Sequence, residues 1–176
     1  MRTIDRSQTA SQWLVKQGIA PAAASGILAT FLGTPVVCTY RAPHLFLRAH
    51  GKASPKPIYT PNFWADGTAL GAAFGRAGQF QGFLSSEEIS RIAKTYYREI
   101  TAVSHNWNEL SDKTFWRVNL RAGETVEGVE GPAAAQPTFS ENIPTGETAS
   151  LARLSGGAIQ VFLNPKTPFI CTPADW

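Results

Sequence analysis

The feature that most constrains this chain is a glycine pair that leads directly into an apolar, strand-forming segment. Gly156 and Gly157 precede Ala158–Leu163, where Gln160 is the one polar residue. Glycines permit positive φ and close backbone approach, whereas β-branched and aromatic residues favour strands. A buried carboxamide without a partner costs about 1–3 kcal/mol, so Gln160 requires a hydrogen-bonding partner or a ligand. The segment indicates the wall of a binding cleft, although an ordinary hairpin turn is the simpler explanation.

Composition places the chain among folded proteins and predicts one domain. Its 176 residues are 43% hydrophobic and 11% aromatic, which is enough for a substantial core. The net charge of +3 comes from scattered lysines and arginines, without the basic run typical of nucleic-acid or membrane-surface binding. No apolar stretch approaches the roughly 20 residues that span a bilayer, and the N-terminus lacks the apolar core of a signal peptide. We therefore expect a monomer that binds neither nucleic acid nor membrane.

Cysteines and histidines give no sign of a metal centre. Cys38 and Cys171 are the only two cysteines, and we expect two buried thiols, although one disulfide is possible by count. His44, His50 and His105 lack the spacing of a zinc site. The sequence predicts no metal.

Helical signals dominate the first part of the chain. Thr9–Gln17 predicts a short helix capped by Thr9, and Pro21 is placed to begin a second helix that ends near Leu32. Residues 1–34 are therefore predicted to form an N-terminal helical cap. The cap lies on the domain formed by residues 35–176, within one compact unit.

The remainder of the chain is richer in strand signals. The clearest helix is capped by Ser85 or Ser86 and reaches Ile100. Gly67–Gly82 fits no single period, and Gly131–Gly146 predicts a long surface loop. The predicted strands or extended segments are Pro35–Arg41, Ile58–Thr60, Thr114–Leu120, Thr125–Val129 and Ala158–Leu163. This order predicts an α+β fold, with helices first and then a mainly antiparallel β body that contains one inserted amphipathic helix.

Several other residues suit the binding of a ligand. Arg41 ends a strand and carries a fork that fits phosphate or carboxylate, although many arginines simply end a strand at the surface. The turn Tyr59–Trp64 holds aromatic rings that stack on flat heterocycles but more often pack in a core. Arg76 lies between glycines that form no dinucleotide motif. Glu141 and Glu147 are candidate general acids or bases, although loop glutamates are usually only solvated.

The order of these motifs resembles the NAD-hydrolysing toxin domains of bacterial competition systems. These include type VI secretion effectors and the tuberculosis necrotizing toxin group. The resemblance covers about Pro35–Pro165 and is strongest in Gly131–Gln136 and Gly156–Phe162. It implies an ADP-ribosyltransferase-like split antiparallel β core, and the N-terminal helices lie outside it.

The resemblance also implies roles for individual residues. Arg41 and Gln160 are the expected catalytic pair: Arg41 holds the phosphate or ribose side of the dinucleotide, and Gln160 acts near the scissile bond. Tyr59 and Thr60 match a turn that lines the nicotinamide pocket. The full set expected to contact NAD+ or NADP+ besides the catalytic pair is Tyr59, Thr60, Phe63, Trp64 and Arg76.

The function implied is that of an NAD(P)+ glycohydrolase toxin without a cofactor. Such a toxin is secreted without a signal peptide, acts in the cytoplasm of a target cell and meets a cognate immunity protein. Two alternatives stay open: a mono-ADP-ribosyltransferase on the same scaffold, which would use Glu141 or Glu147, and a non-enzymatic interaction module. The favoured hypothesis requires one crevice that Arg41 and Gln160 share.

Overall fold

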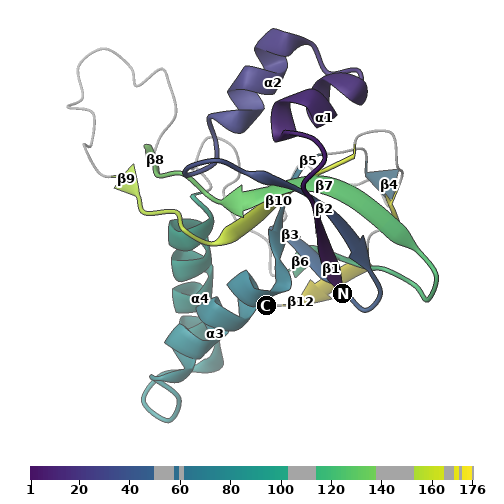
Figure 1. Ribbon diagram of the computed structural model, residues 1–176. Helices are drawn as coiled ribbons and strands as arrows, with labels where there is room; N and C mark the ends of the chain where they lie inside the picture. The colour runs from purple at the N-terminus through teal and green to yellow at the C-terminus, as the bar shows by residue number, and fades with distance from the viewer. Residues whose placement is uncertain are drawn as a thin grey trace.

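An antiparallel sheet of eight strands forms the centre of the computed structural model, which describes residues 1–49, 58–59, 62–102, 114–137, 153–164, 169–170 and 172–175 (Figure 1). The strand order is β1-β2-β7-β10-β5-β3-β6-β12, and every pairing is antiparallel. The strands are β1 (Arg2–Asp5), β2 (Val36–Arg41), β3 (Leu45–Ala49), β5 (Asn62–Asp66), β6 (Thr114–Asn119), β7 (Thr125–Pro132), β10 (Ile159–Leu163) and β12 (Thr172–Asp175). The predicted α+β class with an antiparallel body is confirmed.

Two short strand pairs accompany the sheet. β4 (Ile58–Tyr59) pairs with β11 (Phe169–Ile170), and β8 (Gln136–Pro137) pairs with β9 (Arg153–Leu154). All four strands have two residues each, so these pairs extend the fold locally without adding to the central sheet.

The two N-terminal helices begin where the sequence predicts. In α1 (Ala10–Lys16), Thr9 forms a capping box with Gln12, and Trp13 and Leu14 are buried. Helix α2 (Pro21–Leu28) begins at its proline but ends before the predicted Leu32. The helix stops early because the Leu32 amide donates to the carbonyl of Pro132, at 2.8 Å, instead of continuing the helical ladder.

The glycine-rich segment that fitted no single period forms α3 (Gly67–Gly78). Asp66 caps this helix by accepting a hydrogen bond from the Thr68 amide at 2.9 Å. Ala69, Ala73 and Ala77 form a buried stripe of small residues along α3. The stripe allows close packing against α4 (Ser86–Thr101), and the hairpin extends away from the sheet (Figure 1). Among the described residues, no helix has both the length and the apolar character to cross a membrane.

Three expectations for the β body were wrong. β1 precedes both helices, so the first residues join the sheet instead of a purely helical cap. Phe63 and Trp64 lie in β5 and not in a turn, and Gly131 lies in β7 and not in a surface loop. In each case, hydrogen bonds to strands distant in sequence override the local pattern. Residues 138–146, the remainder of the predicted loop, lie outside the described residues.

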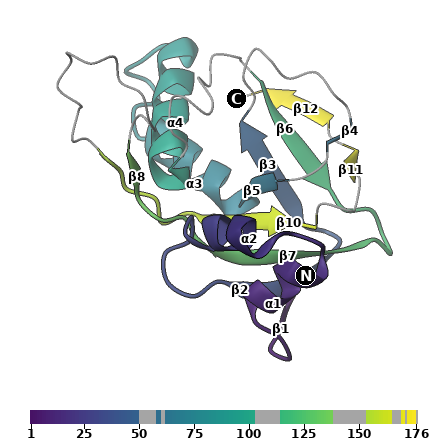
Figure 2. The same ribbon diagram turned by 90° about the horizontal axis from the view of Figure 1, so that it is seen from above.

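The two faces of the sheet are covered differently, because side chains alternate along each strand. On one face, α1 and α2 pack on β2, β7 and β10, and α3 and α4 lie beside β5 (Figure 2). We call this the helix-covered face; its core residues include Trp13, Phe31, Val37, Val129 and Phe162. The opposite face is packed by Cys38, Tyr40, Phe46, Trp64, Leu120, Val126, Val161 and Leu163.

Candidate functional site

Gln160 lies half-buried on the helix-covered face of β10, and one end of its carboxamide is anchored. Its Nε2 donates hydrogen bonds to the Thr30 carbonyl oxygen at 2.6 Å and to Thr30 Oγ1 at 3.2 Å. A carbonyl oxygen can only accept, so the NH2 end must face Thr30 and Oε1 must point away from it. Within the described ranges of the chain, no group donates a hydrogen bond to Oε1. The amide therefore presents an oriented carbonyl dipole.

The glycine pair fixes the start of β10 through close backbone contacts. Gly156 and Gly157 both have positive φ, of 70° and 93°. A Cβ on Gly156 would lie 2.4 Å from the Ala133 carbonyl oxygen, so this position requires glycine. The Gly156 amide donates to the Glu99 carbonyl at 3.0 Å, and the Ala158 amide donates to that of Ile100 at 2.9 Å. These two hydrogen bonds satisfy carbonyls in the last turn of α4. They also fix the start of β10, the strand that contains Gln160.

Phe63 lies on the same face as Gln160, one diagonal step away on the neighbouring strand. In the register of β10 and β5, Gln160 is opposite Ala65 and Phe162 is opposite Phe63. The half-buried Phe63 ring lies 5.2 Å from that of Phe162 and 5.9 Å from that of Phe31, measured between centroids. Ala65 packs instead with α3 and α4. We call the boundary between the two helix pairs, formed by Thr30, Phe63, Ala65 and Gln160, the seam.

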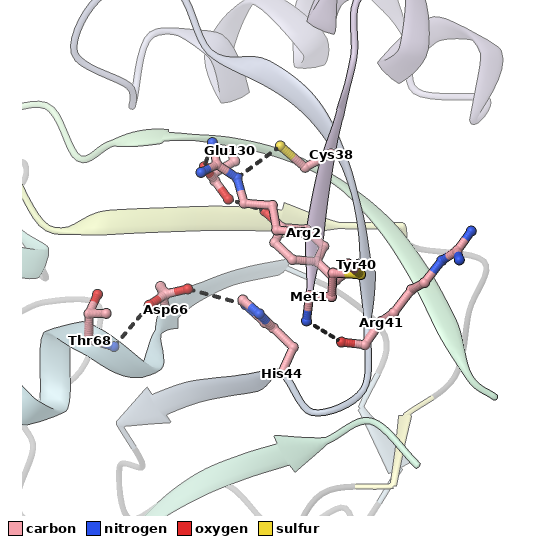
Figure 3. A network of polar contacts seen from close by, with 9 residues as sticks. All are labelled: Met1, Arg2, Cys38, Tyr40, Arg41, His44, Asp66, Thr68 and Glu130. Carbon is pink, nitrogen blue, oxygen red and sulfur yellow. Dashed lines mark hydrogen bonds and ion pairs between the residues drawn. The ribbon is translucent and has the colours of Figure 1, made fainter. Parts of the chain in front are cut away.

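The structure does not bring Arg41 and Gln160 together. Arg41 is opposite Thr125 on β7, whereas Gln160 is opposite Gly131. Thr125 and Gly131 are six positions apart along β7, which corresponds to about 20 Å. Trp13, which donates to Glu127 at 3.1 Å, covers the face between them. Arg41 is exposed, and in Figure 3 its guanidinium points away from its neighbours.

The other residues expected to bind the dinucleotide are dispersed. Trp64 is only 1% exposed and belongs to the core of the opposite face. Arg76 is exposed on α3 and donates to the side chain of Gln79 at 3.0 Å. Tyr59 lies in β4, opposite Phe169. The predicted residues Thr60, Glu141 and Glu147 lie outside the described residues, as do Cys171, His50 and His105.

The opposite face holds a buried polar network that the sequence analysis missed (Figure 3). Glu130 is 4% exposed, forms an ion pair with the Arg2 guanidinium and accepts a hydrogen bond from the Tyr40 hydroxyl at 2.6 Å. Burial and the neighbouring Glu130 carboxylate raise the pKa of Tyr40 far above its usual range. Cys38 is a buried free thiol whose Sγ lies 3.5 Å from Arg2 Nε, and burial raises its pKa. The network therefore places the Glu130 carboxylate between the Arg2 guanidinium and the Tyr40 phenol.

A histidine–aspartate contact lies beside this network. His44 Nε2 is 3.2 Å from Asp66 Oδ2, and the His44 ring lies 4.6 Å from that of Tyr40. The close contact with His44, together with the hydrogen bond from the Thr68 amide, lowers the pKa of Asp66 to about 2. Because Asp66 also caps α3, the pair joins β3 and β5 to that helix. Among the described residues, no group of three metal-ligating side chains is placed to hold a metal ion.

One sequence signal would have revealed the network. Glu130 is flanked by Val129 and Gly131 in a strand whose neighbouring residues are buried, and a buried glutamate normally requires a charged partner. Thr30 gave no comparable signal, because it contacts Gln160 from 130 positions away.

Comparisons with protein-family models, with curated proteins and with solved structures found no match to this chain. Function is therefore inferred from the geometry of the seam and from the motifs that led to it.

Proposed function

We propose that this protein is an NAD(P)+ glycohydrolase and that the seam around Gln160 is its active site. The observation that carries the proposal is the carboxamide of Gln160, which Thr30 anchors through Nε2 while Oε1 accepts no hydrogen bond from the described part of the chain. The half-buried ring of Phe63 lies nearby on the same face and would stack on nicotinamide. The motif resemblance adds an ADP-ribosyltransferase-like β core and the role of a toxin to the proposal.

Cleavage of the bond between nicotinamide and ribose needs little acid or base catalysis. The bond between C1′ of the ribose and the nicotinamide nitrogen breaks, and its electron pair leaves with nicotinamide as a neutral molecule. The ribose becomes oxocarbenium-like, water adds to C1′ and one proton is released. An oriented carbonyl dipole stabilises the developing cation without reorganising, and Gln160 Oε1 would supply that dipole.

The crevice that Arg41 and Gln160 were expected to share does not form, so the proposal rests on Gln160 without Arg41. Arg41 lies at the other end of β7, and Arg76 lies near the far end of α3. Neither residue is assigned to the seam. The proposed site therefore contains groups only for the bond that breaks. Gln160 is the catalytic residue, and Phe63 is the residue that holds nicotinamide.

The test is incubation of the purified protein with NAD+ or NADP+ and measurement of nicotinamide and ADP-ribose. We expect Gln160→Ala to lower kcat by about 10²–10³-fold, the usual loss when one preorganised dipole is removed. Gln81→Ala, in the exposed turn between α3 and α4, is the matched control and should keep wild-type activity. Release of no nicotinamide by the wild type, or full activity in folded Gln160→Ala, would refute the proposal.

The two alternatives predict different products. A mono-ADP-ribosyltransferase would attach label from NAD+ to a macromolecule, whereas the hydrolase yields free ADP-ribose. An interaction module would leave NAD+ intact and would not inhibit growth of the cell that expresses it. For the toxin, a cognate immunity protein is expected to abolish both effects.

A further inference from the structure

Thr30 connects the N-terminal helices to the proposed active site. It follows the last turn of α2, in the part of the chain that the family resemblance does not cover. Its carbonyl oxygen accepts hydrogen bonds from Gln160 Nε2 at 2.6 Å and from the Ala134 amide at 2.8 Å. Two donors occupy both lone pairs of this oxygen, so its position and its role as an acceptor are fixed.

The Thr30 hydroxyl is also restricted to one role toward Gln160. Thr30 Oγ1 donates its proton to the Ile27 carbonyl at 2.7 Å, so it can only accept from Gln160 Nε2, 3.2 Å away. Two acceptors therefore face the same end of the carboxamide. If the amide turned over, Gln160 Oε1 would meet two oxygen lone pairs and both hydrogen bonds would be lost.

We propose that Thr30 is a positioning residue that holds the carboxamide of Gln160 with Oε1 toward the reacting sugar. This inference rests on the proposed function, because it concerns the orientation of the catalytic group of that reaction. The N-terminal helical segment is then a component of the active site and not a separate cap. The buried contact of Phe31 with Phe63 places the same segment against the aromatic part of the seam.

The test compares three variants of the full chain in the NAD+ assay. Thr30→Val keeps the shape but removes the hydroxyl acceptor, and we expect kcat to fall roughly three- to tenfold with KM changed less than twofold, the effect of losing one hydrogen bond. Thr30→Ser keeps the hydroxyl and should restore kcat. Ala23→Gly, at an exposed position of α2, loosens the helix without touching Gln160 and should leave kcat unchanged.

A spectroscopic readout separates positioning from general stability. In Thr30→Val, the side-chain NH2 resonances of Gln160 should shift and exchange faster with solvent, whereas in Ala23→Gly they should stay as in the wild type. If the wild type hydrolyses NAD+ but Thr30→Val keeps its kcat, the inference is overturned and the proposed function stands. If the wild type does not hydrolyse NAD+, both are overturned.

Discussion

Polar side chains on the two faces of the sheet differ in how completely they are bonded to other parts of the protein. On the opposite face, Glu130 is paired with Arg2 and Tyr40, and Asp66 with His44. In the seam, Gln160 is bonded through Nε2, and Oε1 has no donor within the described parts of the chain. A buried network whose polar groups bond to one another stabilises a fold, whereas a half-exposed amide bonded only through Nε2 leaves Oε1 free to accept from a ligand or from water. This contrast supports the proposal that the network is structural and that the seam is the functional site.

The largest effect on stability should come from Arg2→Ala. The substitution leaves the buried Glu130 carboxylate without its cation, which costs about 3 kcal/mol, the low end for a broken ion pair because the Arg2 side chain is 42% exposed. The free energy of unfolding in urea measures this loss. Arg6→Ala, at an exposed arginine that follows β1, is the control and should change stability by less than about 0.5 kcal/mol. Equal effects of the two variants, or loss of NAD+ turnover in folded Arg2→Ala, would contradict the division between the faces.

The next largest loss of stability is expected for a substitution of Gly156, the first of the two glycines that precede β10. Both have positive φ, so either alanine substitution costs about 1 kcal/mol in backbone strain. A Cβ on Gly156 would also collide with the Ala133 carbonyl, whereas one on Gly157 meets open space. We expect Gly156→Ala to lower the unfolding free energy by about 2–3 kcal/mol and to reduce NAD+ turnover, because β10 must shift. Similar losses in both variants would mean that the contact with Ala133 does not position Gln160.

The pH dependence of stability tests the contact between His44 and Asp66, which lies beside the network. The pKa of Asp66 is lowered to about 2 in the folded protein from an ordinary 3.8, because His44 Nε2 lies 3.2 Å from the carboxylate and the Thr68 amide donates to it. The folded state then binds this proton more weakly than the unfolded state. The stabilisation is complete above about pH 4 and is lost as the pH falls toward 2.

Asp66→Asn keeps an oxygen for the cap of α3 and removes the charge. The wild type should therefore lose about 1–2 kcal/mol more than this variant between pH 4 and pH 2, in urea unfolding, with allowance for the partly exposed pair. Glu87→Gln, an exposed substitution in α4, should follow the wild-type profile. Parallel profiles for the wild type and Asp66→Asn would show that the lowered pKa of Asp66 contributes nothing to stability.

The sequence predicted those local features that depend only on residues close together in the chain. Thr9 and Ser85 each cap a helix through a capping box with the residue three positions later, and both helices begin where this pattern predicts. Gly156 was expected to allow close backbone approach, and it lies against Ala133. These features need only a few residues of context, so the linear pattern contains them.

The features that the sequence did not predict depend on pairing between strands that are distant in the sequence. β1 joins the sheet only through β2, and the aromatic segment that looked like a turn becomes β5 because β10 and β3 flank it. The same pairing decides the site. It puts Phe63 and Trp64, neighbours in sequence, on opposite faces, and it places Arg41 and Gln160 at different ends of β7.

The smallest expected effect is that of Arg41→Gln, and it tests the seam most directly. Motif order alone made Arg41 a partner of Gln160, but about 20 Å of β7 and the buried Trp13 separate their positions. Because Arg41 is exposed, we expect Arg41→Gln to change the unfolding free energy by less than about 0.5 kcal/mol and the kcat for NAD+ by less than twofold. Gln160→Ala, assayed beside it, should lose turnover while it stays folded. A large rise in KM for NAD+ in Arg41→Gln would instead show that the dinucleotide reaches across the sheet. The site would then have to extend beyond the seam, past the helices that cover β7.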